Sequence, residues 1–353
     1  MRMPSSRHAM HALPQALASG RWVHRDGKLV VASEVANPEL HSVLASQVDH
    51  VCESPHCAVF ALDDAIAVLH RLEPAAIDND LAELVAGELV RPGHVAIPRA
   101  FERCFAGVVL SSAPSSREAW HAFYDNTLSK LQQVALGSYP GRDSGPVEVF
   151  GRIYEHARER VVGSSLLDVG TCFGFFPLLL QRSEPQLNIV ALDVSAPMLE
   201  LARDAAVSRH YSGTVTFACG DACSLPFASD SFDTVTALHL LEHLTPSSAS
   251  RALQEMCRIA RLRVIVAVPM EEEPDPAYDH VQRFDRESLI KLGEKTGWRC
   301  SFEDYLGGWV VLEPSRAKPL QPAWRLYASV RAPELTSVQY MSTMWFCTRT
   351  RYR

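Results

Sequence analysis

The chain has few lysines and no closely spaced cysteine pairs. These two features argue against a nucleic-acid-binding protein and against a secreted disulfide scaffold. Five of its 34 basic residues are lysines, and 41 acidic residues bring the formal net charge to −7. A mildly acidic chain does not predict a polyanion-binding surface, so we expect no nucleic-acid partner. The nine cysteines are odd in number and form no Cys-x-x-Cys pair, which argues against a secreted disulfide scaffold.

Long apolar runs are missing as well. No stretch approaches the roughly 20 apolar residues that a membrane-spanning helix needs. Residues 1–20 are polar and lack the apolar core of a secretory signal, so we expect them to form a disordered tail. These absences favour a cytoplasmic protein. Its 353 residues are enough to bury a full core without disulfide bonds.

The residue patterns divide the chain near residue 146. Apolar residues on both sides of an Asp-Gly pair predict a hairpin over residues 22–32. Most of residues 35–135 has helical spacing, and a Gly- and Pro-containing linker follows. We therefore expect residues 21–146 to form a mostly helical cap or accessory region. Pairing of two chains into a homodimer through this region is left open.

Strands and helices alternate from residue 147 onward. This alternation predicts an α/β fold with a doubly wound, mostly parallel sheet over residues 147–353. The expected strands are residues 165–169, 188–192, 214–218, 234–238, 264–268, 298–302 and 344–348.

The strongest motif is the segment LLDVGTCFG at residues 166–174, where a buried strand runs into a glycine-containing turn. Glycine allows unusual backbone angles and close approach of a ligand, and the helix that follows offers free N–H groups. Asp193 ends the next strand, roughly 20 residues later, where a carboxylate can accept two hydrogen bonds from a ribose diol. The alternative for Asp193 is an ordinary cap of the helix that begins near residue 196. A dehydrogenase fingerprint, G-x-G-x-x-G, is not supplied by residues 170–175.

Two further motifs complete an ordered set. Gly220-Asp221-Ala222 follows the third strand, and the segment HLLEH at residues 239–243 follows the fourth. The set resembles the class I S-adenosylmethionine-dependent methyltransferases over about residues 147–305. The resemblance implies a Rossmann-like domain with seven strands, of which the last is antiparallel, and S-adenosylmethionine as the cofactor.

The resemblance also implies which residues hold the cofactor. Its loop members would surround the methionine part, Asp193 the ribose, and Asp221 the adenine amino group. Cys172 replaces the middle glycine of the family's loop, and its backbone cannot be assumed to reach angles that favour glycine. The implied cofactor-binding residues are Asp168, Gly170, Cys172, Gly174, Asp193, Val194, Asp221, Ala222 and His239.

A narrower resemblance concerns the acceptor. Residues 120–128, 168–177 and 268–284 are similar to the mycofactocin oligosaccharide methyltransferases of actinobacteria. That family is implied to O-methylate a glucose in a glycan attached to a redox cofactor. We therefore expect O-methylation of a sugar hydroxyl in a small molecule or oligosaccharide. The alternatives are a binding protein that keeps the fold without catalysis, and a methyltransferase that acts on RNA, protein or nitrogen.

A hydroxyl acceptor needs a base, and histidine suits that task near neutral pH. His243 and His280 follow the fourth and fifth strands, where ligands meet such sheets, and we expect one of them to be the base. An equally weighted alternative makes His243 a structural residue. Imidazoles and a carboxylate can also hold a divalent ion, which would involve His239, Glu242, His243 and His280, but we expect no metal.

Four other features are expected to be structural. The segment with His50, Cys52, His56 and Cys57 resembles half a zinc site and is expected to be a zinc-free loop. The acidic residues 271–275 are expected to form a solvated loop, with a lid as the alternative. Trp309, and the aromatic residues of 120–124, are expected to be buried core, although the tryptophan is also suited to stacking on a sugar.

Overall fold

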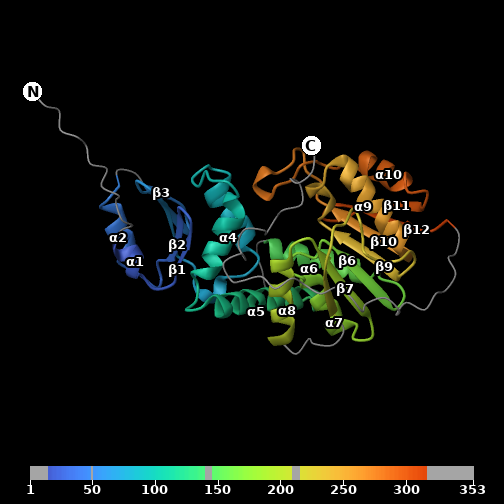
Figure 1. Cartoon of the computed structure of the whole chain (residues 1–353), viewed down its shortest axis with the longest axis horizontal. Coiled ribbons are helices and arrows are strands. Elements are labelled where there is room, and N and C mark those ends of the chain that lie inside the picture. The colour runs from blue at the N-terminus through green and yellow to red at the C-terminus, as the bar shows by residue number, and fades with distance from the viewer. Residues whose placement is uncertain (1–14, 49–50, 140–144, 209–214, 316–353) are drawn as a thin grey trace, which may run out of the picture. The chain divides into compact units, whose positions relative to one another are not determined.

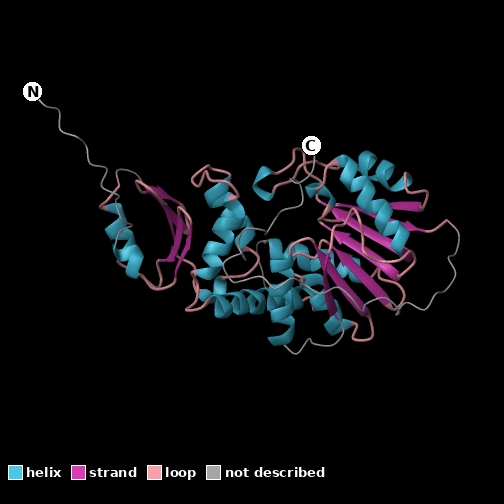
Figure 2. Ribbon diagram, in the orientation of Figure 1, coloured by secondary structure: helices cyan, strands magenta, loops and turns pink. Residues whose placement is uncertain are grey.

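The computed structural model describes residues 15–48, 51–139, 145–208 and 215–315. The chain forms two compact units, Met1–Thr127 and Leu128–Arg353. The division falls inside helix α5 (Ser116–Ala135), earlier in the chain than the boundary expected near residue 146. Figure 1 labels many of the elements of each unit, and Figure 2 distinguishes helices from strands by colour.

The first unit contains a five-stranded sheet of order β1-β2-β5-β4-β3. Strands β2 and β5 are parallel, and the other neighbours are antiparallel. The strands are β1 (Val23–Asp26), β2 (Leu29–Ser33), β3 (Val51–Glu53), β4 (Cys57–Ala61) and β5 (Ile66–His70). The helices are α1 (Gln15–Ser19), α2 (Leu40–Ala45), η1 (Pro74–Ala76), α3 (Leu81–Val85), η2 (Ala86–Val90) and α4 (Ala100–Leu110).

The sheet corrects part of the sequence-based prediction. The hairpin expected at residues 22–32 is confirmed as β1 and β2. Residues 51–70, for which a helical pattern was expected, form three strands instead. These strands are at most five residues long, and β4 and β5 are nearly continuously apolar. Such short runs do not distinguish a buried strand from a buried helix by periodicity.

The predicted tail is partly folded. Residues 15–19 form α1, and the side chain of Leu17 is fully buried with Val30 and Phe60 in the core of this unit. Residues 1–14 lie outside the described residues. The aromatic residues expected as core, Trp120 and Phe123 among them, are buried.

The second unit is built on a seven-stranded sheet of order β11-β12-β10-β9-β6-β7-β8. Strands β10, β9, β6, β7 and β8 are parallel, and β12 is antiparallel to β10 and β11. The strands are β6 (Ser165–Val169), β7 (Asn188–Asp193), β8 (Val215–Cys219), β9 (Phe232–Leu238), β10 (Ala260–Val268), β11 (Arg299–Asp304) and β12 (Gly308–Glu313). The helices are α6 (Pro146–Arg158), α7 (Phe175–Ser183), α8 (Ala196–Ser208), η3 (Leu241–His243), α9 (Pro246–Ile259), η4 (Pro276–Tyr278) and α10 (Arg286–Glu294).

Both faces of this sheet are covered, as parallel sheets require. Helices α9 and α10 contribute Leu253 and Leu289 to the core on one face. Helices α6 and α7 contribute Ile153 and Leu180 to the core on the other. The seven-stranded, doubly wound, mostly parallel fold predicted from the sequence is confirmed.

The antiparallel strand is β12, and its position differs from the sequence-based prediction. The strand expected at residues 344–348 lies outside the described residues, whereas β12 occupies the segment around Gly308 and Trp309. The side chain of Trp309 is fully buried, which confirms the core alternative. In the part of the chain that the structure describes, no helix has the length and apolarity to cross a membrane.

The strand order determines where a ligand site is expected. The chain begins the sheet in its centre with β6, continues outward to β8, and then crosses to β9 on the other side of β6. Such a reversal leaves a crevice at the carboxyl ends of the strands. The predicted motifs follow β6, β7, β8 and β9 at these ends.

Candidate active site

The glycine turn after β6 is held against the neighbouring strand. The N–H groups of Gly170 and Thr171 both donate to the carbonyl of Leu192, at 2.8 and 3.0 Å. Gly170, Cys172 and Gly174 all have positive φ, at 75°, 50° and 70°. Cys172 therefore does adopt the left-handed conformation that could not be assumed from its sequence. For a residue with a Cβ that conformation costs roughly 1–2 kcal/mol.

Asp193 supports this turn. One carboxylate oxygen accepts a hydrogen bond from the Cys172 N–H at 2.9 Å, and the other accepts one from the Ser195 N–H at 2.9 Å. Burial raises the pKa of Asp193, against the backbone N–H groups that lower it. The contact with Ser195 is a turn before α8 in which a side chain accepts from the backbone two residues on, and it is not a cap of the helix itself. Each carboxylate oxygen has a second lone pair, so this turn and a ribose ligand are compatible.

An exposed apolar side chain follows Asp193 at the end of β7, and a second carboxylate follows the end of β8. Val194 is 39% exposed next to Asp193, and Asp221 is exposed on the neighbouring strand end. The N–H of Gly220 donates to the Asp193 carbonyl at 3.0 Å, which joins the two strand ends. Ala222 is buried beside them. These groups fit a nucleoside. The Asp193 carboxylate can accept hydrogen bonds from a ribose diol, Val194 offers an apolar surface to a base, and the Asp221 carboxylate can accept from an amino group.

Asp168 is the buried acid at the end of β6. Its carboxylate accepts a hydrogen bond from the Thr236 hydroxyl at 2.7 Å. Burial raises the pKa of Asp168 to about 6, with the charge of Asp193 acting in the same direction. A cationic amino group, as in the methionine part of the expected cofactor, would lower that pKa again.

The segment after β9 carries a buried acid between two histidines. The N–H of His239, at φ 57°, donates to the carbonyl of Ala267 at 2.9 Å, and its ring contacts Phe150. Glu242 in η3 has a side chain that is 1% exposed, and one of its oxygens lies 3.3 Å from His239 Nδ1. Among the described residues, neither carboxylate oxygen of Glu242 has a hydrogen-bond partner.

The two predicted bases meet here. The rings of His243 and His280 lie 4.9 Å apart, edge to face. Nδ1 of His280 is 2.8 Å from a carboxylate oxygen of Glu271. Burial lowers the pKa of His243, partly offset by the charge of Glu242, so its imidazole is neutral near pH 7. Ligand atoms of Glu242, His243 and His280 all lie within 4.8 Å of one another.

The sequence did not predict Glu271 as a residue of the site. It was expected to be one acid of a solvated loop, but its side chain is half-buried and orients His280. The acids that follow, Glu272 and Glu273, are exposed as expected. Only the repetition of acids near a histidine marks the segment, and that pattern has no helical or strand period.

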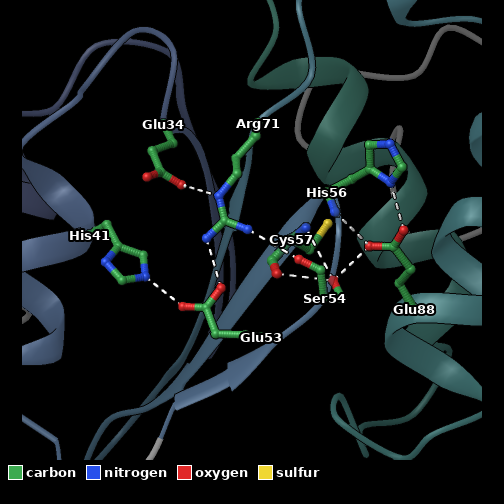
Figure 3. Close-up of polar contacts among 8 residues, drawn as sticks. All are labelled: Glu34, His41, Glu53, Ser54, His56, Cys57, Arg71 and Glu88. Atoms are coloured by element: carbon green, nitrogen blue, oxygen red, sulfur yellow. Dashed lines mark hydrogen bonds and ion pairs between the residues drawn. The ribbon is translucent and has the colours of Figure 1, made fainter.

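The suspected zinc residues of the first unit do not converge. His56 is paired with Glu88 at 2.6 Å, and Cys57 is buried, which raises the pKa of its thiol to about 12 (Figure 3). His50 lies outside the described residues. Nearby, Arg71 bridges Glu34 and Glu53, so the cluster is an ion-pair network on the sheet. Within the described ranges, Glu242, His243 and His280 are the group with metal-ligand geometry.

Comparison with known proteins agrees with the site's position in the sheet. Residues 167–268, from β6 to the end of β10, match the family described as a methyltransferase domain. The chain carries a class I S-adenosylmethionine-dependent methyltransferase domain. The cofactor of this domain is S-adenosylmethionine.

The matching relatives differ in what their names say they methylate. The demethylmenaquinone methyltransferase of Roseiflexus sp. (strain RS-1) is 36% identical over 101 residues, covering 29% of this chain and 40% of the relative. The ajmaline N-methyltransferase of Rauvolfia serpentina is 23% identical over 145 residues, covering 40% and 49%. The chain thus spans half or less of these two relatives. The crystal structure of the [4+2]-cyclase SpnF is 26% identical, covers 50% of this chain and 71% of that one, and has a TM-score of 0.41.

Proposed function

We propose that the protein transfers a methyl group from S-adenosylmethionine to a hydroxyl oxygen of a small molecule, and that the acceptor is a sugar. One observation carries this proposal: the imidazoles of His243 and His280 lie together, and the segment that carries His243 adjoins the glycine turn. The side chain of Leu240, three residues before His243, packs so closely on Gly170 that an added Cβ would lie 2.8 Å from it. The histidine segment therefore adjoins the turn at which the cofactor is expected.

Residues of the chain suited to holding the cofactor are at the ends of three strands. Asp193 would accept the ribose hydroxyls, Asp221 the adenine amino group, and Asp168 the cationic amino group of the methionine part. Val194 offers an apolar surface to the base. When bound, S-adenosylmethionine supplies a methyl group on a positively charged sulfur that is open to attack by a nucleophile.

The acceptor hydroxyl must lose its proton, because a neutral hydroxyl is a poor nucleophile. His243 or His280 would accept that proton at an imidazole nitrogen as the oxygen–carbon bond forms and the sulfur–carbon bond breaks. The products are the methyl ether, the demethylated cofactor and a protonated imidazole, which returns its proton to water. The chain's contribution is alignment, exclusion of water and proton transfer.

A sugar acceptor is supported by two features. The segments 120–128, 168–177 and 268–284 resemble the mycofactocin oligosaccharide methyltransferases, and glucose in such a glycan is the acceptor that this implies. Tyr305 and Leu306, exposed at the β11–β12 turn, lie beside the end of β10, because Gly307 adjoins the carbonyl of Val268. One face of the Tyr305 ring stacks on His156, with centroids 4.2 Å apart, and its exposed part, together with Leu306, suits the face of a sugar.

Calorimetric titration with S-adenosylmethionine is the first test, on wild-type protein and Asp193→Ala. We expect a 10- to 100-fold loss of affinity in the variant, since the ribose hydroxyls lose hydrogen bonds to a charged acceptor, worth about 1.5–3 kcal/mol. Formation of S-adenosylhomocysteine is then measured with glucosides, oligosaccharides, a demethylated quinol, an amine and RNA.

The outcomes separate the alternatives. Turnover with glucosides alone supports the proposal. Turnover with the quinol, the amine or RNA assigns another acceptor, and cofactor binding without any turnover favours a binding protein. Absence of cofactor binding in the wild type would overturn the proposal.

A further inference from the structure

We propose that Glu242, His243 and His280 form a binding site for one divalent transition-metal ion, such as Zn²⁺ or Mn²⁺, at the acceptor side of the domain. The ion's role in catalysis rests on the proposed function, whereas its binding does not. Two imidazole nitrogens and a carboxylate oxygen form a donor set that favours zinc-like ions over Mg²⁺ or Ca²⁺.

The spacing of the three ligand atoms is close to that found around a bound metal ion. The three ligand atoms lie within 4.8 Å of one another. Ligands of one zinc ion, each about 2.0–2.2 Å from the metal, are on the order of 3–4 Å apart. Small side-chain rotations would close the difference, and the three residues come from only two segments, η3 and the loop after η4.

Among the described residues, the carboxylate of Glu242 has an ion-pair contact with His239 but no hydrogen bond of ordinary geometry, which is little support for a buried acid. Its side chain is 1% exposed, and no described residue donates a hydrogen bond to either oxygen. Its near neighbour is His239 Nδ1 at 3.3 Å. Burying a charged group without such partners is costly, and a cation at this point would offset that cost directly.

The surrounding contacts hold the ligands in position. Nδ1 of His280 faces Glu271 at 2.8 Å, which leaves Nε2 to bind an ion, the arrangement in which a carboxylate orients a metal-bound histidine. The N–H groups of Val281 and Gln282 both donate to the Glu242 carbonyl, at 2.9 and 3.3 Å. The amide of Gln282 donates to the carbonyls of Leu241 and Leu244, at 2.8 and 2.6 Å. The histidine loop and η3 are thus joined without help from an ion.

A three-residue site leaves coordination positions open for the acceptor. Sugar hydroxyls on neighbouring carbons can occupy two of them, so the site would select acceptors with a vicinal diol. A hydroxyl bound to the ion releases its proton to water more readily, and the oxygen then attacks the methyl carbon as the sulfur–carbon bond breaks. With the ion bound, both imidazoles are ligands, and the ion takes over the activation of the hydroxyl.

The test measures metal binding and cofactor binding separately. The full-length protein is stripped with a chelator and titrated with Zn²⁺ and Mn²⁺ by calorimetry, with metal content checked by mass spectrometry. We expect one equivalent of Zn²⁺ in the wild type. We expect at least a 100-fold weaker affinity in Glu242→Gln and His280→Gln, and 10- to 100-fold in Glu271→Gln, which removes only the orienting group.

His56→Gln is the matched control, because this histidine is also paired with a glutamate but belongs to the first unit. It should bind Zn²⁺ like the wild type. Retained affinity for S-adenosylmethionine shows that a variant is folded. In the Co²⁺-loaded protein, a visible absorption band that shifts on adding a vicinal diol, but not a monohydroxyl acceptor, supports the open positions.

Failure of this proposal differs from failure of the proposed function. Less than 0.2 equivalents of bound metal in the wild type, or unchanged metal affinity in His280→Gln, would overturn the proposed metal site. Methylation that continues in excess chelator would show that the proposed function holds without the metal. Stoichiometric metal binding without any turnover would contradict the proposed function and leave the site standing.

Discussion

Cys172 combines an unusual backbone conformation with a hydrogen bond to the acid that ends β7. Its φ of 50° lies in the left-handed region, and its N–H donates to Asp193. Glycine would adopt this φ without strain, but glycine also loses about 0.5–1 kcal/mol more conformational entropy on folding. The strain offsets much of this entropy, so the cysteine is tolerated at this position of the turn.

We therefore expect Cys172→Gly to change the free energy of unfolding by less than about 1 kcal/mol, and to retain affinity for S-adenosylmethionine. Cys172→Val should be destabilised by about 1–3 kcal/mol, because a β-branched side chain is strained at this φ. Chemical denaturation measures both. A loss of more than 2 kcal/mol in the glycine variant would show that the thiol itself packs in an essential way.

At the scale of elements, the β11–β12 turn requires glycine at position 307, because its backbone lies against the end of β10. A Cβ on Gly307, at φ 133°, would lie 2.5 Å from the carbonyl oxygen of Val268 in β10. We expect Gly307→Ala to lower the free energy of unfolding by roughly 2–4 kcal/mol, since the backbone of a central strand cannot move away. Gly297→Ala is the control, because Gly297 has φ 74° with nothing within 4 Å and should show the strain alone, about 1–2 kcal/mol. Equal losses in the two variants would rule out the steric cause.

Strand β5 ends in a buried histidine, which makes the first unit sensitive to acid. Burial lowers the pKa of His70 to about 4, and its Nε2 contacts the Ser111 hydroxyl at 3.0 Å. The unfolded state, with the ordinary pKa of 6.5, binds more protons between pH 6.5 and 4, so stability falls as the pH falls through this range. The loss is on the order of 3 kcal/mol, at about 1.4 kcal/mol per pKa unit.

Hydrogen exchange of the β5 amides between pH 7 and pH 4 measures this effect. In His70→Gln, which keeps a hydrogen-bonding group but cannot take up the proton, we expect most of the slope to vanish. Two carboxylates, Glu53 and Glu88, are partly buried, but ion pairs with Arg71 and nearby histidines lower their pKa values. Their protonation below about pH 4.5 removes further stability from both the wild type and the variant. An identical slope in the variant would assign the acid sensitivity to those carboxylates.

The whole molecule consists of two units with separate cores, and a ligand of one need not stabilise the other. We expect two unfolding transitions, of which only that of the second unit rises with S-adenosylmethionine, by about 2.7 kcal/mol at 100 times its dissociation constant. Calorimetric scans of the full chain with and without cofactor measure both transitions, and Asp193→Ala should lose most of the shift. One transition that moves as a whole would show that the units unfold together.

Most of the second unit could be predicted from the sequence. Strands β6, β7, β9 and β10 are interior and apolar, and helices of ordinary length lie between the strands from β6 to β10 along most of the chain, so local pattern and position in the sheet agree. In the first unit, β4 and β5 are short apolar runs whose period is ambiguous, and β5 also pairs with β2, more than 30 residues earlier in the chain. Nothing local showed that they would form strands.

The sequence by itself determined the order of the motifs along the sheet, because parallel strands bring their carboxyl ends to one edge whatever the details of packing. Asp168, Asp193, Asp221 and the histidine segment could be placed there without coordinates. Only the tertiary structure decided which side chains meet at that edge. The approach of His280 to His243, the support from Glu271 and the lack of hydrogen-bond partners of Glu242 depend on how one loop folds back onto η3, and a loop has no periodicity from which such contacts can be read.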